Sequence, residues 1–181
     1  MNEISLAETY LQSAIKQFRY YKSLGDGAFA QIEDDDIHWT PEPESNSITV
    51  VVKHMHGNML SRWTDFLTSD GEKEWRHRDD EFIDYSTTKA DVTAIWEEGW
   101  KCVFDALAPL TPSDLQRIVR IRNEPHTVID AMNRQIAHYA YHVGQIVYIA
   151  KVIRSSSWRS LSVPKGKSQE FNNQYSEKFK N

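Results

Sequence analysis

The strongest constraint on the fold is a long helical pattern over residues 127–154. Apolar side chains recur there every three or four positions, as one stripe of a helix requires. The stripe consists of Val128, Ile129, Met132, Ile136, Tyr139, Val143, Ile146, Val147, Ala150 and Ile153. Because an apolar stripe is stable only when another element covers it, the remainder of the chain has to supply the elements that pack against it.

Two histidines, His138 and His142, flank this stripe one helical turn apart, and Gln135 lies between them and its apolar centre. Imidazoles four residues apart can reach a single cation, because successive turns place them on the same side of a helix. Two ligands hold a metal weakly, so a third ligand from another element is needed. Without that ligand, these histidines would only form hydrogen bonds at the border of the helical core.

Three further stretches show the same periodicity, over residues 5–31, 48–67 and 87–109. Side chains that can cap a helix precede each stretch; they are Ser5 with Glu8 three residues on, then Ser45, Asn46 or Ser47, and finally Thr87 or Thr88. The connection from residue 69 to residue 84 is long and mostly charged, which suits a crossover between helices that are not antiparallel neighbours. The sequence therefore predicts an all-α fold, a four-helix bundle with a long crossover between its second and third helices.

These helices account for a single domain, which we assign to residues 1–181. Residues 155–181 contain few apolar anchors, so we expect an extended C-terminal tail. The stretch 115–122, L-Q-R-I-V-R-I-R, alternates apolar and charged residues and predicts either a short extended segment or an irregular loop. The four acidic residues 33–36 favour a solvated turn over a calcium site, because the glycine of a calcium loop is missing.

Composition excludes several classes of function. The 181 residues carry a net charge of −5, and the basic residues form no stripe, which disfavours nucleic-acid binding. The only cysteine, Cys102, lies in an apolar helical pattern and has no partner for a disulfide, so it is expected to be buried filler rather than a nucleophile. No stretch resembles a signal peptide or a membrane span. These features predict a cytoplasmic protein.

The second predicted helix contains two candidates for the third ligand, His54 and His56. Counting about 100° per residue, His56 lies about 60° from the apolar centre of that helix and His54 about 140° from it. Periodicity therefore favours His56. His54 begins a polar strip with Asn58, Arg62 and Asp65, which would line a groove if another helix faced it and would otherwise be a solvated surface.

Two motifs resemble the DinB-like superfamily: N-S-I-T-V-V-V-K-H-M-H-G-N-M-L-S-R-W over residues 46–63, and H-Y-A-Y-H-V-G-Q-I over residues 138–146. The closer likeness is to a small bacterial branch whose second helix reads K-H-x-x-G-N-x-x-S-R-W. Together with the order of the helices, the resemblance covers nearly the whole chain. It implies an up-down-down-up bundle, often a homodimer, with a divalent metal such as Zn or Ni held in a cleft.

The resemblance also implies a ligand set. In that superfamily, one histidine of the second helix and an H-x-x-x-H pair of the fourth hold the metal. These ligands correspond here to His54, His138 and His142. His56 falls at a position that varies in the superfamily and is kept as the alternative ligand. Characterised relatives include thiol-cofactor S-transferases and a mycothiol-dependent maleylpyruvate isomerase, and others are regarded as metal-dependent hydrolases.

Three imidazoles leave a coordination position for a reactant, so we expect an enzyme that activates a low-molecular-weight thiol or water against a small electrophilic substrate. The residues between His138 and His142 are Tyr, Ala and Tyr, without the glutamate of zinc proteases, which weakens the hydrolase interpretation. Asn58 and Arg62 are the expected contacts for a polar ligand or cofactor. Catalytic residues are not assigned. The alternative is a non-catalytic, dimeric, stress-related bundle or binding module in which the metal is structural or absent.

Overall fold

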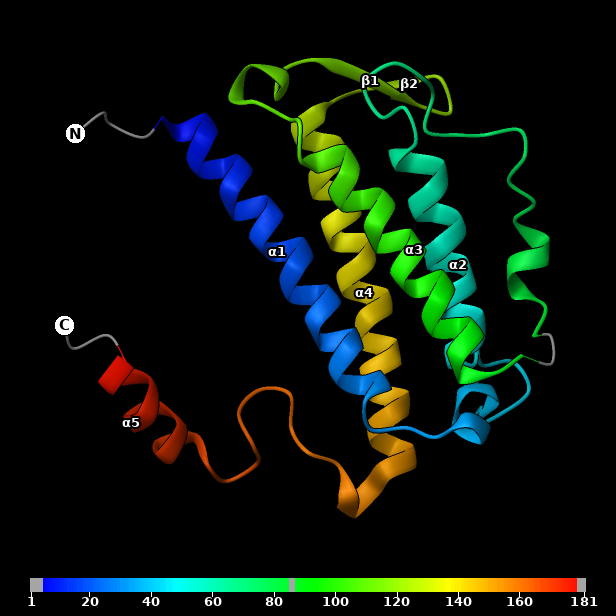
Figure 1. The fold of residues 1–181 in the computed structure, drawn as a ribbon, viewed down its shortest axis with the longest axis vertical. Helices are drawn as coiled ribbons and strands as arrows, with labels where there is room; N and C mark the ends of the chain where they lie inside the picture. Colours follow the sequence, from blue (N-terminus) through cyan, green and yellow to red (C-terminus); the bar gives the residue numbers. More distant parts are fainter. Residues whose placement is uncertain (1–4, 85–86, 179–181) are drawn as a thin grey trace.

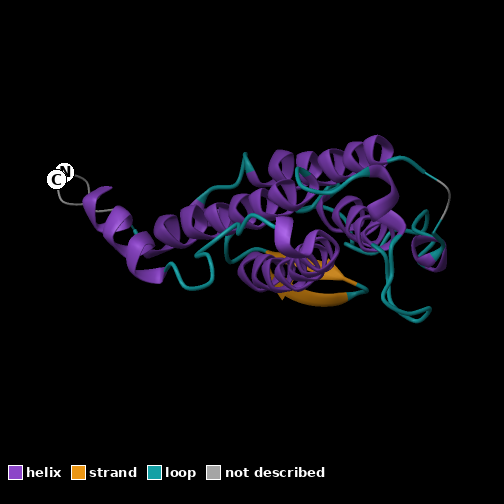
Figure 2. Cartoon of the chain, turned by 90° about the horizontal axis from the view of Figure 1, so that it is seen from below, coloured by secondary structure: helices purple, strands orange, loops and turns teal. Residues whose placement is uncertain are grey.

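The computed structural model describes residues 5–84 and 87–178, and this part of the chain is mostly helical (Figures 1 and 2). Its helices are α1 (Leu6–Phe29), α2 (Ile48–Trp63), α3 (Lys89–Leu107), α4 (Val128–Arg154) and α5 (Ser168–Lys178). Four short 3-10 helices are η1 (Asp34–His38), η2 (Asp79–Phe82), η3 (Pro112–Asp114) and η4 (Ser155–Ser157), and one antiparallel hairpin joins β1 (Ile118–Ile121) to β2 (Glu124–Thr127). Apart from that hairpin, the prediction of an all-α fold agrees with the structure.

Side-chain caps set where the four long helices begin. Ser5 accepts a hydrogen bond from the backbone N–H of Glu8, and Ser47 caps α2 in the same way. Thr88 and Thr127 form capping boxes with the carboxylates three residues further on. Each cap satisfies a backbone N–H that has no acceptor within its helix, so the predicted helix starts are close to the observed ones.

The helices α1 to α4 lie side by side, with α2 and α3 running in one direction and α1 and α4 in the other (Figure 1). α2 packs against both α3 and α4, and α1 packs against α4. The connection between α2 and α3 passes along the outer side of α2, where η2 contacts it. As a consequence α2 is covered on three sides. None of the helices in the described part of the chain combines the length and apolar character that a membrane crossing requires.

Three segments differ in detail from the sequence prediction. α2 ends at Trp63 rather than near residue 67, because Asp65 takes a left-handed backbone conformation with φ 52°. The stretch 115–122, for which a loop was the alternative, contains β1, and the turn to β2 uses the positive φ values of Arg122 and Asn123. The prediction of an extended tail is wrong for residues 168–178, which form α5 to one side of the long helices (Figure 1). Residues 179–181 of the predicted tail lie outside the described residues.

A group of aromatic side chains forms the centre of the core. Trp63 of α2 contacts Phe18 of α1 edge to face, with ring centroids 5.5 Å apart. The indole N–H of Trp63 donates a hydrogen bond of 2.9 Å to the hydroxyl of Tyr139 on α4, and that hydroxyl donates one of 3.1 Å to Asn58 on α2. These bonds satisfy every polar atom of two large buried side chains and fix α4 against α2.

Gly25 marks a close approach between α1 and α3. A Cβ at this position would lie 2.3 Å from a ring carbon of Trp96, which is 2 % exposed. Gly144 of α4 has no atom within 4 Å of such a Cβ. Both glycines lie inside helices, so alanine gains the same helix propensity at either position, and only the crowding differs.

We therefore expect Gly25→Ala to have a free energy of unfolding about 1–3 kcal/mol lower than Gly144→Ala. The measurement is urea denaturation of the two variants followed by circular dichroism. Equal stabilities would show that the indole of Trp96 moves aside without cost, and that the contact between α1 and α3 is looser than the structure indicates.

Candidate metal centre

Three histidines meet between α2 and α4. His54 extends from α2, and His138 and His142 extend from successive turns of α4. The Nε2 atom of His138 lies 3.3 Å from Nε2 of His54 and 3.1 Å from Nε2 of His142. One ligand atom from each ring lies within 4.8 Å of the others. The three side chains are therefore close enough to share one metal ion.

Hydrogen bonds on the far side of two rings fix which nitrogen faces the cluster. Nδ1 of His54 lies 3.0 Å from a carboxylate oxygen of Glu81, and Nδ1 of His142 lies 2.8 Å from the amide oxygen of Gln145. Both partners accept hydrogen bonds, so each Nδ1 carries the proton when its ring is neutral. Nε2 of both rings then presents a lone pair to the cluster, which is the form that binds a cation.

The donor set fits a divalent cation better than it fits a hydrogen-bonded group. A proton on Nε2 of His138 can satisfy only one of the two lone pairs that face it. At a tetrahedral ion with nitrogen ligands at about 2.0–2.1 Å, two ligand atoms lie about 3.3 Å apart, close to the 3.1 Å and 3.3 Å found here. Two of the three nitrogen–nitrogen distances therefore match the spacing at such an ion, and the third lies within 4.8 Å.

The preference of the helical wheel for His56 does not match the structure. His56 lies on the opposite side of α2, where its Nε2 is 2.9 Å from a carboxylate oxygen of Glu98 on α3. The wheel assumes one buried face, whereas α2 is covered by α3, by α4 and by the crossover. For the same reason, most of the polar strip below His54 is not a solvated surface, since Asn58 is 7 % exposed and Arg62 is 5 % exposed; only Asp65, beyond the end of α2, is exposed.

The crossover supplies two site residues that sequence reasoning missed. Glu81 in η2 accepts hydrogen bonds of 2.7 Å and 2.9 Å from Arg76, in addition to its contact with His54, and both side chains are buried. Gly57 makes room for them, since a Cβ there would lie 2.1 Å from a carboxylate oxygen of Glu81. No periodicity distinguishes these residues in a charged segment. The one sequence signal is the glycine within the helical string K-H-M-H-G-N.

The histidine cluster opens into a cavity of about 190 Å³. The residues that line it are His54, Asn58, Arg62, Arg76, Arg78, Arg122, Arg134, Gln135 and His138. Both expected ligand contacts, Asn58 and Arg62, are among them. Arg62 also donates to the hydroxyl of Ser61 and to the backbone carbonyl of Gly71, which holds the start of the crossover against the end of α2.

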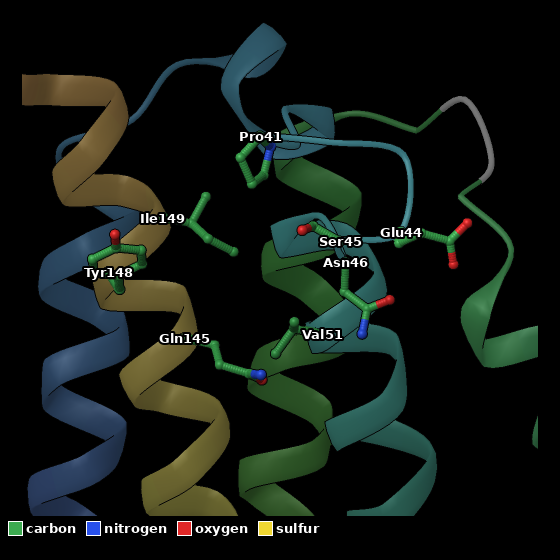
Figure 3. Close-up of a pocket in the computed structure, with 8 residues that line it drawn as sticks. All are labelled: Pro41, Glu44, Ser45, Asn46, Val51, Gln145, Tyr148 and Ile149. Carbon is green, nitrogen blue, oxygen red and sulfur yellow. The ribbon is translucent and has the colours of Figure 1, made fainter.

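A second cavity, of about 310 Å³, lies near the first turn of α2 (Figure 3). It is formed by α4 and by the loop that precedes α2, and Gln145 lines it while also holding His142. Its other lining residues are Pro41, Glu44, Ser45, Asn46, Val51, Tyr148 and Ile149. No histidine of the cluster lines it, whereas His54 and His138 line the first cavity.

Burial keeps the two histidines of α4 uncharged. Desolvation, followed by the charges of His142 and His54, lowers the pKa of His138 to about 3. Desolvation also lowers the pKa of His142. Burial would raise the pKa of Glu81, but the hydrogen bonds from His54 and Arg76 outweigh it and lower that pKa. Near neutral pH the site therefore combines neutral imidazoles on α4 with an ionised carboxylate behind His54.

Cys102 takes no part in this site. It is partly buried on α3, and its Sγ lies 3.8 Å from the hydroxyl of Thr64. Burial raises the pKa of its thiol, which disfavours the reactive thiolate. This environment agrees with the interpretation of Cys102 as filler.

Three histidines of two helices thus lie close together in a mostly helical chain. The model of a protein family described as "Protein of unknown function (DUF1572)" matches residues 5–167, which include all three histidines and the whole crossover. The chain belongs to that family. No curated protein matches it.

The lowered pKa of His138 predicts how the metal-free protein responds to acid. The pKa is about 3 in the folded chain and 6.5 for an ordinary histidine, so below pH 6.5 the unfolded chain binds a proton that the folded chain does not. The stabilisation is complete above pH 6.5 and is lost as the pH falls towards 3. We expect a loss of about 1 kcal/mol per pH unit below pH 6, measured by urea denaturation after chelation and dialysis.

His138→Gln should remove most of this slope, while His56→Gln on the other side of α2 should retain it. A metal-free wild-type protein whose stability is the same at pH 7 and pH 5 would contradict the neutral state assigned to His138.

Proposed function

We propose that the chain is a DinB-like four-helix bundle of up-down-down-up topology that holds a divalent ion, Zn or Ni or a similar metal, on His54, His138 and His142. The resemblance of two motifs, the direction of the four long helices in Figure 1 and the spacing of the three imidazole nitrogens support this assignment. On the same resemblance we propose a cytoplasmic homodimer that acts on a small molecule.

The observation that carries the proposed activity is the composition of the cavity beside the histidines. A divalent ion held on three imidazoles leaves a coordination position and acts as a Lewis acid, which makes a thiol or water more acidic. Among the described residues, none of the side chains that line the cavity is an aspartate or a glutamate. Glu81 is engaged by His54 and by Arg76, so the cavity offers no free carboxylate as the general base that hydrolysis of an ester or amide requires.

A thiol needs less help than water, because its ordinary pKa is about 8.5 and its thiolate is a strong nucleophile. We therefore favour an S-transferase in which a low-molecular-weight thiol attacks a small electrophile, with hydrolysis as the second possibility. In this scheme Asn58 and Arg62 orient the reactant, and Gln145 and Glu81 hold the rings of His142 and His54 in place.

Metal content tests the site directly. We expect the purified untagged protein to carry about one divalent ion per chain, and His138→Ala to lose it because two imidazoles hold a metal weakly. His56→Ala, on the same helix as His54, should retain it. The measurement is elemental analysis by mass spectrometry, with circular dichroism to confirm folding. A folded wild-type protein that neither carries nor takes up Zn, Ni or Mn would refute the metal site.

The same samples separate an enzyme from a non-catalytic module. Metal-loaded protein should accelerate the reaction of a thiol such as cysteine with chlorodinitrobenzene, and His138→Ala should abolish that acceleration. A structural ion would behave differently, since its removal would lower the melting temperature strongly while no loaded sample turned over. That outcome would favour a non-catalytic binding module over an enzyme.

Glu81 provides a second test of the ligand geometry. Glu81→Gln retains the size of the side chain but removes the charge that fixes the tautomer of His54, and we expect about 10–100-fold weaker metal affinity. Competition with a chromogenic chelator measures this affinity. Glu98→Gln, which alters the partner of His56 instead, is the matched control. Equal affinities in Glu81→Gln and the wild type would exclude a supporting role for Glu81.

A further inference from the structure

The cavity beside the histidines is unusually rich in arginine. Five of its nine lining residues are arginines, brought together from α2, the crossover, the hairpin turn and α4. They are Arg62, Arg76, Arg78, Arg122 and Arg134. Chain segments far apart in the sequence therefore converge to place guanidinium groups around one small space.

Neighbouring carboxylates compensate for only part of this charge. One oxygen of Glu72 lies 2.6 Å from Arg78, 3.0 Å from Arg122 and 3.6 Å from Arg62. Glu81 pairs with Arg76. Burial would raise the pKa of Asp70, but backbone hydrogen bonds and then the charge of Arg62 lower it, so this carboxylate also lies near Arg62. Five guanidinium groups against three carboxylates leave two positive charges without a counter-charge at the cavity.

Several polar atoms of the lining side chains are unsatisfied. In the described part of the chain, six buried side-chain nitrogen or oxygen atoms have no hydrogen-bond partner. Four of these six belong to cavity residues: Nε of Arg62, Nη1 of Arg76, the amide oxygen of Gln135 and Nδ1 of His138. Buried polar groups are normally satisfied, so their concentration at one place indicates a ligand that supplies the missing partners.

Arg62 and Arg76 are the buried arginines of the cavity. Arg62 is 5 % exposed and Arg76 is 8 % exposed, and each has an N–H donor without an acceptor. Arg134 is exposed at the rim, and its side chain forms no hydrogen bond or ion pair with any residue that the structure describes. Burial, and then the like charge of Arg76, lowers the pKa of Arg62 to about 10.

We infer that this cavity binds the carboxylate or phosphate group of a small anionic molecule, held by Arg62, Arg76 and Arg134 beside the histidine cluster. Guanidinium groups match both oxyanions, because their planar donors form paired, charge-assisted hydrogen bonds. The volume of about 190 Å³ corresponds to roughly six water molecules at about 30 Å³ each. It admits the anionic group and a short chain.

The position of the anion adds a class of substrate to the proposed function, and this addition rests on that function. His54 and His138 line the same cavity as the arginines. A molecule anchored by its anionic group would thus present its next few atoms to the imidazole nitrogens. The substrate or thiol is then an acid or a phosphate ester whose reactive atom lies a short distance from its charge.

The test uses the full chain and two probe anions, inorganic phosphate and succinate, titrated at low salt by isothermal calorimetry. Metal-loaded protein and protein dialysed after chelation are compared. We expect saturable binding of at least one anion to both samples. Binding of phosphate alone assigns a phosphate-bearing ligand, and binding of succinate alone assigns a carboxylate.

Two variants show whether the arginines are responsible. Arg134→Gln should weaken binding at least tenfold, because it removes an unpaired donor at the rim. Arg19→Gln on α1 makes the same change in net charge at an exposed position outside the cavity and should change binding less than twofold. Arg62→Gln, used only if circular dichroism shows it folded, should abolish binding. No saturable binding of either anion, or equal weakening by Arg134→Gln and Arg19→Gln, would overturn the inference.

The two proposals fail separately. If the protein takes up no metal but still binds the anion, the anion site is retained and the metal centre is refuted. Stoichiometric metal without any anion binding does the reverse.

Discussion

The geometry of the site depends on the contact that Tyr139 makes between α4 and α2. Tyr139 is fully buried, and its hydroxyl both accepts from Trp63 and donates to Asn58. A buried hydroxyl with unsatisfied bonds would cost about 1–3 kcal/mol, so any rotation or sliding of α4 against α2 is opposed. His138 precedes Tyr139 in the chain, and its ring therefore meets that of His54 at a fixed distance.

A second constraint comes from the crossover, which places a buried ion pair behind the histidine cluster. An ion pair such as that of Arg76 and Glu81 is weak support for stability, because removing two charges from water offsets most of their attraction. The role of this ion pair is to hold the carboxylate of Glu81 in place. The carboxylate sets the tautomer of His54, and Gly57 lets η2 approach α2 closely enough for that contact. The charged, aperiodic connection thus belongs to the site as much as the helices do.

The sequence predicted what depends on local periodicity. Four long helices, their caps and the pair formed by His138 and His142 follow from spacing along one helix. The choice of His54 over His56 does not, because a wheel with one buried face cannot represent a helix covered on three sides. Here the family resemblance supplied the information, and the structure places His54, not His56, beside the other two rings.

Contacts between distant segments could not be predicted. Glu81 and Arg76 lie in a charged segment without any periodicity, and only the folded crossover brings them to α2. The helix α5 was missed because Phe171 and Tyr175 are its only large apolar residues, too few to form a stripe. The cavity arginines come from four segments, so their convergence is a property of the tertiary structure alone.

The arginines and the histidines also constrain each other electrostatically. Guanidinium groups beside a cation site oppose metal binding, since like charges repel strongly where water is scarce. The carboxylates of Glu72 and Glu81 offset part of that repulsion, and an anion in the cavity would offset more. Thermodynamic linkage makes such an effect reciprocal: an anion that strengthens the hold on the metal is itself bound more tightly when the metal is present. A site built in this way would assemble its metal and its anionic ligand together, and would hold either one less tightly alone.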